Sequence, residues 1–401
     1  MSQVALKIAA EIQNQGAIPF ARFMELALYC PVYGYYEKEG DTIGRHGDYF
    51  TSVSVGSLFG ELLAFQFAQW LEWGPGQVSS EPVDLPGEGP RPARASGGPP
   101  TPAHPTLHLV EAGAHRGELA RDILAWLREH RPALFPNLEY WILEPSPQRR
   151  RWQRERLAEF GPQVRWAVSW AELAGHLRSP LHGIVFSNEL LDAFPVHRFV
   201  WDAAQRQWFE YGVTLAGEAF AWTRMPVDQS VVHSLAAVGP GQGSGRGLTD
   251  ALPDGLVIET SPAAIQWWRE AAQLLSSGKL LTLDYGFTVE ERLLSGRAES
   301  TLRSYYRHGV QASVLDHPGE QDLTAHVDFS ALRAAGEDCG LRTEALVSQG
   351  QFLTPIAAQT WERPAEFGEW TPARKRQFQT LTHPDHLGRA FRVLVQSRPV
   401  G

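Results

Sequence analysis

Short apolar runs separated by helical patterns dominate the chain after residue 106. The runs expected to form buried strands cover residues 107–110, 140–143, 164–168, 183–186 and 279–283. Between them, helices are expected over residues 147–159 and 170–177, where the side-chain pattern changes from a continuous apolar run to a mixed one. Strands that alternate with helices in this way predict an α/β fold with a parallel sheet.

The sequence before and within this core has other patterns. Residues 4–14, 19–29 and 56–73 predict helices, so residues 1–74 are expected to form an N-terminal helical lobe with a Gly/Tyr-rich lid loop. Pro, Gly and Ser dominate residues 75–106, which predicts a disordered insertion before a core over residues 107–401.

Two stretches of the core predict strands of a different kind. Residues 197–223 alternate with period two, which predicts a β-hairpin or meander outside the parallel sheet, within an inserted segment at about 197–254. The apolar stretch around Val347 and the run at 391–396 are expected to be the last two strands, an antiparallel pair at the sheet edge.

Composition narrows the class of protein. A chain of 401 residues with 43% hydrophobic content can bury a large core, and its formal net charge of -9 argues against a general binder of nucleic acid or membrane surfaces. Cys30 and Cys339 give neither a disulfide framework nor a zinc pattern, which indicates a reducing compartment. We find no apolar run of membrane-spanning length and no signal or transit peptide, so we expect a bacterial-type cytoplasmic protein.

The first two predicted strands both end in a carboxylate. Glu111 closes the first strand and is followed by Gly113 and Gly117, where a glycine allows the backbone to approach a ligand closely. Glu144 closes the second strand, where one carboxylate can accept hydrogen bonds from both hydroxyls of a ribose. The dinucleotide fingerprint is absent, since His115 stands where its second glycine belongs. The pattern therefore favours an adenosine ligand without a pyrophosphate, such as S-adenosylmethionine, over NAD, with an ordinary strand-to-helix turn as the alternative.

A second group of polar residues follows the fourth strand. Asn188, Glu189 and Asp192 come directly after the apolar run, at the carboxyl end where ligands bind in open α/β sheets. Such a group can hold a cationic or hydrogen-bonding acceptor. The alternative is that Asn188 and Asp192 only cap the following helix, although a cap does not require Glu189.

The Gly/Tyr-rich segment at 31–52 has two interpretations. It is either a loop packed on the core or a lid in which Gly44 and Gly47 allow closure over a ligand and Asp48 points into the site.

Polar residues near position 320 could be drawn as a metal cluster: His308, His317, Asp322, Thr324, His326 and Asp328. Their spacing matches no ligand pattern, so we expect no metal. Thr324 or Asp328 is instead expected to cap a helix over residues 329–338.

Several stretches occur in the order found in the MidA-like family, whose mitochondrial members are complex I assembly factor arginine methyltransferases. They are IPFARFMELALYCPVYGYY, IGRHGDYFTS, LVEAGAHRGELARDIL, LEPSPQRRRWQ, FSNELLDAFPVHRF, LLTLDYG and DLTAHVDFSAL. The chain resembles this family over nearly its whole length. The resemblance implies a class I methyltransferase fold with a seven-stranded, mostly parallel Rossmann-like sheet, S-adenosylmethionine as methyl donor and a protein arginine as acceptor. It also suggests a respiratory-complex subunit as partner, while a homodimer is left open.

The resulting hypothesis divides the site residues into two groups. Glu189 and Asp192, with Asp48 from the lid, are expected to hold a guanidinium through bidentate, charge-assisted hydrogen bonds. The donor-binding group is expected to contain Glu111, Gly113, Gly117, Glu144, Asn188, Gly47 and Thr51.

Two other functions stay open on the sequence. A non-catalytic assembly or scaffold protein could retain the fold, because His115, Val53 and Ser54 depart from the usual family pattern. A methyltransferase that acts on a small molecule is the other alternative.

Overall fold

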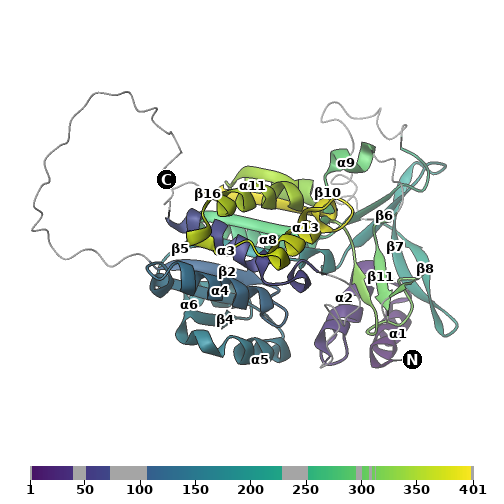
Figure 1. Ribbon diagram of the computed structural model, residues 1–401. Helices are drawn as coiled ribbons and strands as arrows, with labels where there is room; N and C mark the ends of the chain where they lie inside the picture. Colours follow the sequence, from purple (N-terminus) through teal and green to yellow (C-terminus); the bar gives the residue numbers. More distant parts are fainter. Residues whose placement is uncertain are drawn as a thin grey trace, which may run out of the picture.

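The central sheet is built from the apolar runs of the second half of the chain. The structure is a computed structural model that describes residues 2–38, 51–72, 106–227, 252–294, 300–306, 309–311 and 313–398. Its parallel strands are β2 (Leu107–Ala112), β3 (Leu138–Leu143), β4 (Val164–Ala167), β5 (Leu181–Asn188) and β10 (Leu275–Phe287). This confirms the α/β class and the five predicted core strands (Figure 1).

Two antiparallel strands complete one edge of this sheet. β16 (Phe391–Arg398) pairs with β10, and β15 (Arg342–Ser348) pairs with β16. The strand order is therefore β15-β16-β10-β5-β2-β3-β4, with the short β14 (Val327–Asp328) also paired to β10. The predicted antiparallel pair at the sheet edge is confirmed.

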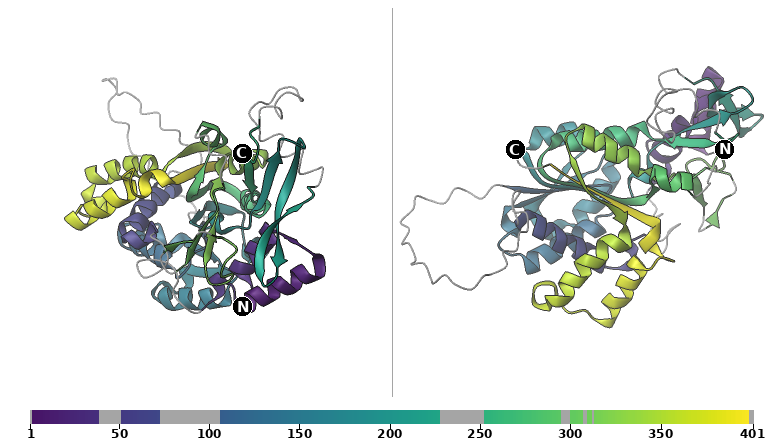
Figure 2. Two further views of the ribbon diagram at one scale, coloured as in Figure 1. Left: turned by 90° about the vertical axis from the view of Figure 1, so that its right-hand side faces the viewer. Right: turned by 90° about the horizontal axis from the view of Figure 1, so that it is seen from above.

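Helices cover both faces of the central sheet (Figure 2). On one face lie α3 (Leu58–Glu72), α4 (Glu118–His130), α11 (Gln349–Glu362), α13 (Pro372–Thr382) and the short α12 (Pro364–Phe367) and α14 (Leu387–Ala390). On the other face lie α6 (Trp170–His176), α8 (Pro262–Leu274) and α10 (Phe329–Asp338). Asp328 caps α10 by accepting hydrogen bonds from the backbone N–H groups of Ser330 and Ala331. Of the two residues predicted to cap this helix, Asp328 is therefore the one that does so.

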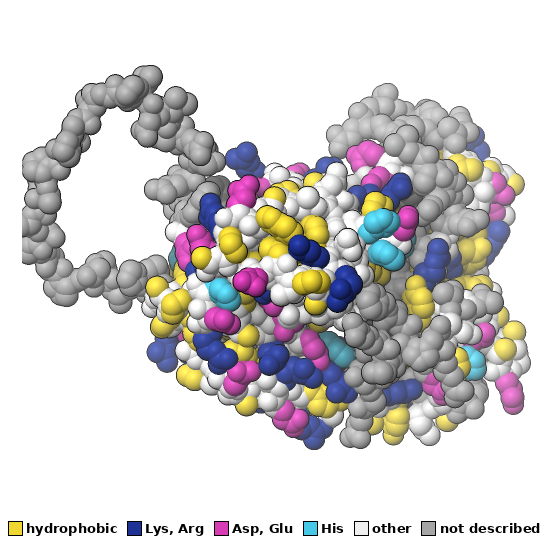
Figure 3. All heavy atoms as spheres, viewed as in Figure 1, with side chains coloured by type: hydrophobic (Ala, Val, Ile, Leu, Met, Phe, Trp, Pro, Cys, Tyr) yellow, Lys and Arg dark blue, Asp and Glu magenta, His cyan; other side chains and the backbone are white. Residues whose placement is uncertain are grey.

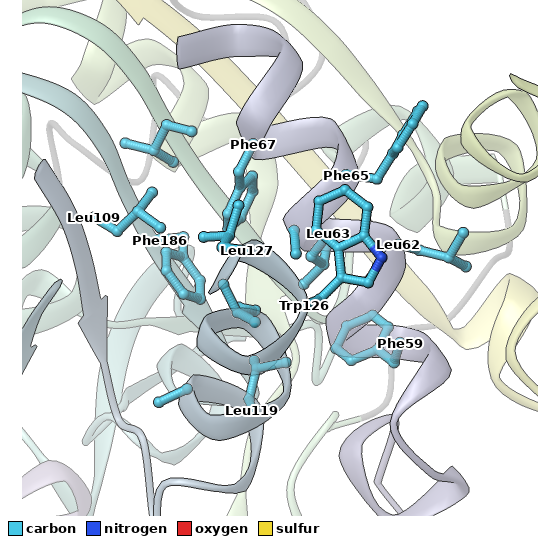
Figure 4. Packing of buried hydrophobic residues seen from close by; sticks show 14 of the residues in the cluster. Phe59, Leu62, Leu63, Phe65, Phe67, Leu109, Leu119, Trp126, Leu127 and Phe186 are labelled. Atoms are coloured by element: carbon cyan, nitrogen blue, oxygen red, sulfur yellow. The ribbon is translucent and has the colours of Figure 1, made fainter. Parts of the chain in front are cut away.

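The α3–α4 layer forms the largest apolar core. α3 is apolar around most of its circumference, so it is buried between α4 and the C-terminal helices. Phe67 of α3 packs on Phe186 of β5 with ring centroids 5.0 Å apart, and Phe65 meets Trp126 of α4 edge to face (Figure 4). Each fully buried side chain of this size stabilises the fold by roughly 1.5–3 kcal/mol. This layer fixes the position of α4, and thereby the turn that precedes it.

A second, antiparallel sheet lies beside the central one. Its strands are β1 (Ile18–Pro19), β6 (His197–Asp202), β7 (Gln207–Ala216), β8 (Ala219–Met225) and β9 (Val257–Thr260), in the order β1-β7-β6-β9 with β8 on β7. The predicted meander outside the parallel sheet is thus present. The helices α1 (Gln3–Gln15) and α2 (Phe20–Tyr29) pack with this sheet, whereas α3 belongs to the central core. The domain boundaries at residues 74 and 107 stay predictions.

A third sheet and several short elements complete the described chain. β11 (Arg303–Tyr306) pairs with β12 (Gly309–Val310) and β13 (Asp322–Thr324), and α5 (Pro147–Arg156) follows β3. α9 (Val289–Leu294) follows β10. The insertion predicted over residues 75–106 lies, apart from Thr106, outside the described residues. None of the helices that the structure describes combines the length and apolarity needed to span a bilayer.

Candidate active site

The carboxyl ends of four parallel strands lie side by side along one border of the central sheet, which we call the sheet edge from here on and which is distinct from the lateral edge formed by β15. β2, β3, β5 and β10 are neighbours in the order β3-β2-β5-β10, and parallel strands end at the same edge. The residues immediately past or near these ends are the glycine turn, Glu144, Asn188 with Glu189, and Asp284. This edge therefore brings together most of the residues selected from the sequence.

The turn after β2 depends on glycine. Gly113 has φ +75°, and a Cβ at this position would lie 2.8 Å from Cδ1 of Leu190. Gly117 has φ +83° and precedes α4, while its N–H donates to the carbonyl of Ala114 at 2.6 Å. His115 also adopts a left-handed conformation, with φ +46°. The turn is therefore tight, and a side chain in place of Gly113 would clash with Leu190.

Glu111 faces a neighbouring strand. Its Oε2 accepts a hydrogen bond from the hydroxyl of Tyr140 on β3 at 2.6 Å, and the side chain is buried. Burial raises the pKa of the Glu111 carboxyl to about 8, although the bond from Tyr140 opposes this shift. Burial therefore favours the protonated form of Glu111.

Glu144 is held by its own loop and by α5. Its Oε1 accepts from the backbone N–H of Ser146 at 2.9 Å, and its Oε2 accepts from Nε2 of Gln153 at 3.3 Å. Burial raises the pKa of this carboxyl, and the nearby Arg149 guanidinium opposes the shift. Sequence reasoning missed Gln153, which looks like one more polar position on an Arg-rich helix.

Asn188 and Glu189, at the end of β5, have buried acceptor atoms without a hydrogen-bond donor in the described part of the chain. Oε1 of Glu189 accepts from the backbone N–H of Ser52 and from Nδ2 of Asn188, each at 3.0 Å. Oδ1 of Asn188 and Oε2 of Glu189 are buried and accept no hydrogen bond within the described part of the chain. Neither Asn188 nor Asp192 caps a helix, because the following element is a single 3-10 turn without a side-chain cap. Unmatched buried acceptors indicate a place where a ligand supplies donors.

Asp192 lies in a cluster of buried carboxyls. Burial raises the pKa of Asp192 strongly, and the nearby charges of Asp284, Asp322 and Glu189 raise it further. Asp284 fixes the loop, since its Oδ2 accepts from the backbone N–H groups of Leu190, Leu191 and Asp192. Asp284 was not selected from the sequence, and Asp322 was considered only as a member of a metal cluster. In the sequence Asp284 follows the apolar run of the fifth strand, as Glu111 and Glu144 follow theirs, and this signal could have identified it.

The N-terminal segment joins the two groups. The hydroxyl of Tyr36 donates to Oδ1 of Asp322 at 2.7 Å, and the guanidinium of Arg149 lies 4.9 Å from the centre of the Tyr36 ring. Glu37 accepts from the hydroxyl of Ser146 at 3.1 Å, beside Glu144. Residues 35–37 thus contact both the Glu144 side and the aspartate side of the sheet edge.

The predicted lid is only partly described. Gly44, Gly47 and Asp48 lie outside the described residues. Thr51 is buried, and its hydroxyl accepts from the backbone N–H of Ser54 at 3.1 Å, while the adjacent Ser52 reaches Glu189. No group of three or more His, Cys, Asp or Glu residues within the described ranges could hold a metal ion, and His308 lies outside them.

The strand order, the helices on both faces and the glycine turn after the first strand of the central sheet define a class I methyltransferase with a Rossmann-like fold. The chain belongs to a family of S-adenosyl-L-methionine-dependent methyltransferases, whose family model matches residues 95–347.

Solved structures and curated relatives agree with this assignment. A protein from Burkholderia thailandensis bound to S-adenosyl-homocysteine has 30% sequence identity and a TM-score of 0.77, covering 99% of this chain and 92% of its own. The protein arginine methyltransferase NDUFAF7, mitochondrial, of Mus musculus is 27% identical over 95% of this chain and 81% of its own. Its Drosophila melanogaster homolog is 26% identical over 98% and 84%. The protein is therefore an S-adenosylmethionine-dependent methyltransferase.

Proposed function

We propose that the protein transfers a methyl group from S-adenosylmethionine to an arginine side chain of a protein. The observation that carries the proposal is the unmatched buried acceptor Oε2 of Glu189, beside the carboxyl of Asp192. A guanidinium carries five N–H donors in a planar fork, which suits such a set of acceptors. The names of the relatives, protein arginine methyltransferases, support the same acceptor.

The donor site in this proposal lies between the glycine turn and Glu144. Glu144 offers carboxylate oxygens to ribose hydroxyls. The glycine turn lies beside it, with Gly113 packed on Leu190 and Gly117 on Leu157. Asn188 provides a further acceptor for the amino-acid part of the donor. Glu111 is assigned to the donor site through the carboxyl end of β2, although its carboxyl is bound to Tyr140. Gly47 and Thr51 stay assigned to this site as predictions.

The acceptor side needs positioning more than covalent chemistry. The bound donor supplies an electrophilic methyl group. Glu189 and Asp192 hold the guanidinium through charge-assisted hydrogen bonds and favour a lone pair on the attacking nitrogen. As the new N–C bond forms and the S–C bond breaks, the nitrogen loses a proton, which the Glu189 carboxylate is placed to accept. Asp48 is expected to contribute from the lid.

Replacing Glu144 with Ala should weaken donor binding. Loss of hydrogen bonds to a charged acceptor reduces affinity by about 10- to 100-fold. The measurement is calorimetric titration with S-adenosyl-homocysteine, and Glu139→Ala on the same strand is the matched control. Equal affinity of Glu144→Ala and the wild type would remove Glu144 from the donor site.

Replacing Glu189 with Gln should separate binding from transfer. The amide keeps the shape of the side chain but loses the charge that holds a guanidinium, so we expect transfer to fall by about 100-fold or more while the affinity for S-adenosyl-homocysteine stays within about twofold. Methylation of an arginine-containing peptide pool is followed by mass spectrometry, with free arginine as a parallel acceptor and Glu270→Gln as control. Unchanged transfer would exclude the role of Glu189, and transfer to free arginine but no peptide would indicate a small-molecule enzyme.

The remaining predictions concern partners and location. A respiratory-complex subunit as the acceptor, a homodimer and a cytoplasmic location stay predictions. A non-catalytic scaffold would bind the donor and transfer no methyl group to any acceptor in these assays.

A further inference from the structure

Gln153 is a completely buried amide on an otherwise polar helix. α5 has five arginines among its ten residues, and Gln153 is its one fully buried member, with 0% of its surface exposed. A buried amide is costly unless its polar atoms are matched. We therefore expect each polar atom of Gln153 to have a specific hydrogen-bond partner.

Each polar atom of Gln153 has a partner in a different segment. Nε2 donates to the carbonyl oxygen of His115 at 2.9 Å and to Oε2 of Glu144 at 3.3 Å. Oε1 accepts from Nε1 of Trp166 on β4 at 3.0 Å. An amide nitrogen has two hydrogens, so it can serve both the glycine turn and Glu144 at once.

The contact with the glycine turn also involves packing. Cγ of Gln153 lies 3.7 Å from the position that a Cβ on Gly117 would occupy. His115, whose carbonyl Gln153 binds, has the left-handed φ of +46°, which costs a non-glycine residue free energy unless its surroundings hold it in place. Gln153 therefore supports the backbone of the turn where it is least relaxed.

We propose that Gln153 is a positioning residue of the donor site, which fixes the glycine turn and the Glu144 carboxylate relative to each other. This inference rests on the proposed assignment of the donor site to these two features. The amide holds the two halves in one arrangement before the donor binds, so that binding does not have to order them. It also directs one oxygen of Glu144 toward α5 and leaves its other lone pairs for the ligand.

The electrostatic surroundings decide what a charged substitute would do. Burial raises the pKa of Glu144, with Arg149 lowering it and Glu37 raising it. Burial also lowers the pKa of His115, as do the charges of Arg149, Arg116 and Arg156. On the β4 side, Arg154 lies 5.2 Å from the Trp166 ring. A carboxylate at position 153 would face the Glu144 carboxylate and the His115 carbonyl without a hydrogen to donate, whereas its protonated form could donate one hydrogen bond again.

The test is the Gln153→Glu variant in the full chain, titrated with S-adenosyl-homocysteine at pH 8 and pH 5.5. We expect affinity about 10- to 100-fold below wild type at pH 8. The ratio of wild-type to variant affinity should shrink by about tenfold at pH 5.5, since the protonated side chain regains a donor. A purely structural role would lower stability and affinity together at each pH, so chemical denaturation of the variant is measured at both pH values.

Two further variants keep the result interpretable. Trp166→Phe removes only the bond to Oε1 and should retain donor affinity within about threefold. Gln153→Met keeps the side-chain volume but has no N–H group to donate a hydrogen bond, so it should lose affinity equally at both pH values. It replaces Gln153→Glu in the test if that variant does not fold. Wild-type affinity of a folded Gln153→Glu or Gln153→Met variant at pH 8 would overturn the inference, as would a loss that Trp166→Phe reproduces.

The outcome is distinguishable from failure of the donor-site assignment. If Glu144→Ala binds S-adenosyl-homocysteine normally, the assignment itself is wrong. If Glu144→Ala loses binding and the Gln153 variants do not, only the role of Gln153 is overturned.

Discussion

At the scale of single residues, Glu189 combines an unusual backbone with an unusual carboxyl. Its φ of +50° lies in the left-handed region, and burial raises its pKa to about 8, opposed by hydrogen bonds from Ser52 and Asn188. Burial without a bound cation therefore favours the protonated form of Glu189, whereas Oε2 is free to accept hydrogen bonds in the ionised form. A cationic acceptor would favour the ionised form, so binding of the acceptor and release of this proton are coupled.

This coupling predicts a pH dependence. The value of kcat/KM for a guanidinium acceptor should rise with pH up to an apparent pKa near 8, and Glu189→Gln should lack this limb. Because the folded-state pKa is raised, stability is greatest below the ordinary carboxyl pKa and is lost as pH rises toward 8. Glu189→Gln should therefore unfold at a higher denaturant concentration than wild type at pH 9 and at a similar one at pH 4. A pH profile shared by both proteins would contradict the prediction.

The sequence placed part of the candidate site and missed the rest for a physical reason. Glu144 and Glu189 follow apolar strands, and the end of a parallel strand is a predictable location. Gln153 and Asp322 reach the same edge only through tertiary packing, from a helix and from the short β13. No local pattern distinguishes them from solvent-exposed polar residues.

At the scale of elements, the regular strands and helices were predictable where burial imposes a strong pattern. β2 and β5 are buried along nearly their whole length, and α4 has a clear apolar face. The two-residue β1 and the strands β11 to β13 were not predicted, because their pairing depends on distant partners rather than on local propensity. The C-terminal helices α11, α13 and α14 were also missed, since Pro355 and many polar positions weaken their helical pattern.

At the scale of the whole molecule, Glu259 ties the second sheet to the segment that leads into β11. It accepts from Arg198 at 3.2 Å, from the hydroxyl of Ser300 at 2.5 Å and from the N–H and hydroxyl of Thr301 at 2.8 and 2.6 Å. Arg198 and Glu259 are both buried. This ion pair therefore lies in the interior of the contact between the second sheet and the segment that leads into β11, which we call the junction.

Removing the charge of Glu259 should loosen that junction. Glu259→Gln leaves the Arg198 guanidinium buried without its counterion, which should lower the free energy of unfolding by about 3 kcal/mol. Chemical denaturation measures the change, and Glu11→Gln, which affects the more exposed pair with Arg22, should cost less than about 1 kcal/mol. Equal effects of the two substitutions would show that the buried pair does not support the junction.

The distribution of charge on the surface bears on how a cationic acceptor is selected. On the face in Figure 3, basic and acidic side chains are intermixed among the described residues. The concentrated acidic character lies instead in the buried group around Asp192. Selection of a cationic acceptor is therefore expected inside the site rather than through long-range attraction to this face.

The bond between Tyr36 and Asp322 joins residues 286 positions apart in the sequence, and the same site combines Ser52 from the N-terminal part with Glu189 from the middle of the chain. A partly folded chain cannot assemble such a site, so S-adenosylmethionine should bind the completed fold almost exclusively. By mass action, donor at a hundred times its Kd would add about 2.7 kcal/mol to the resistance against unfolding. The cellular supply of this nucleoside would then set the lifetime of the enzyme as well as its turnover.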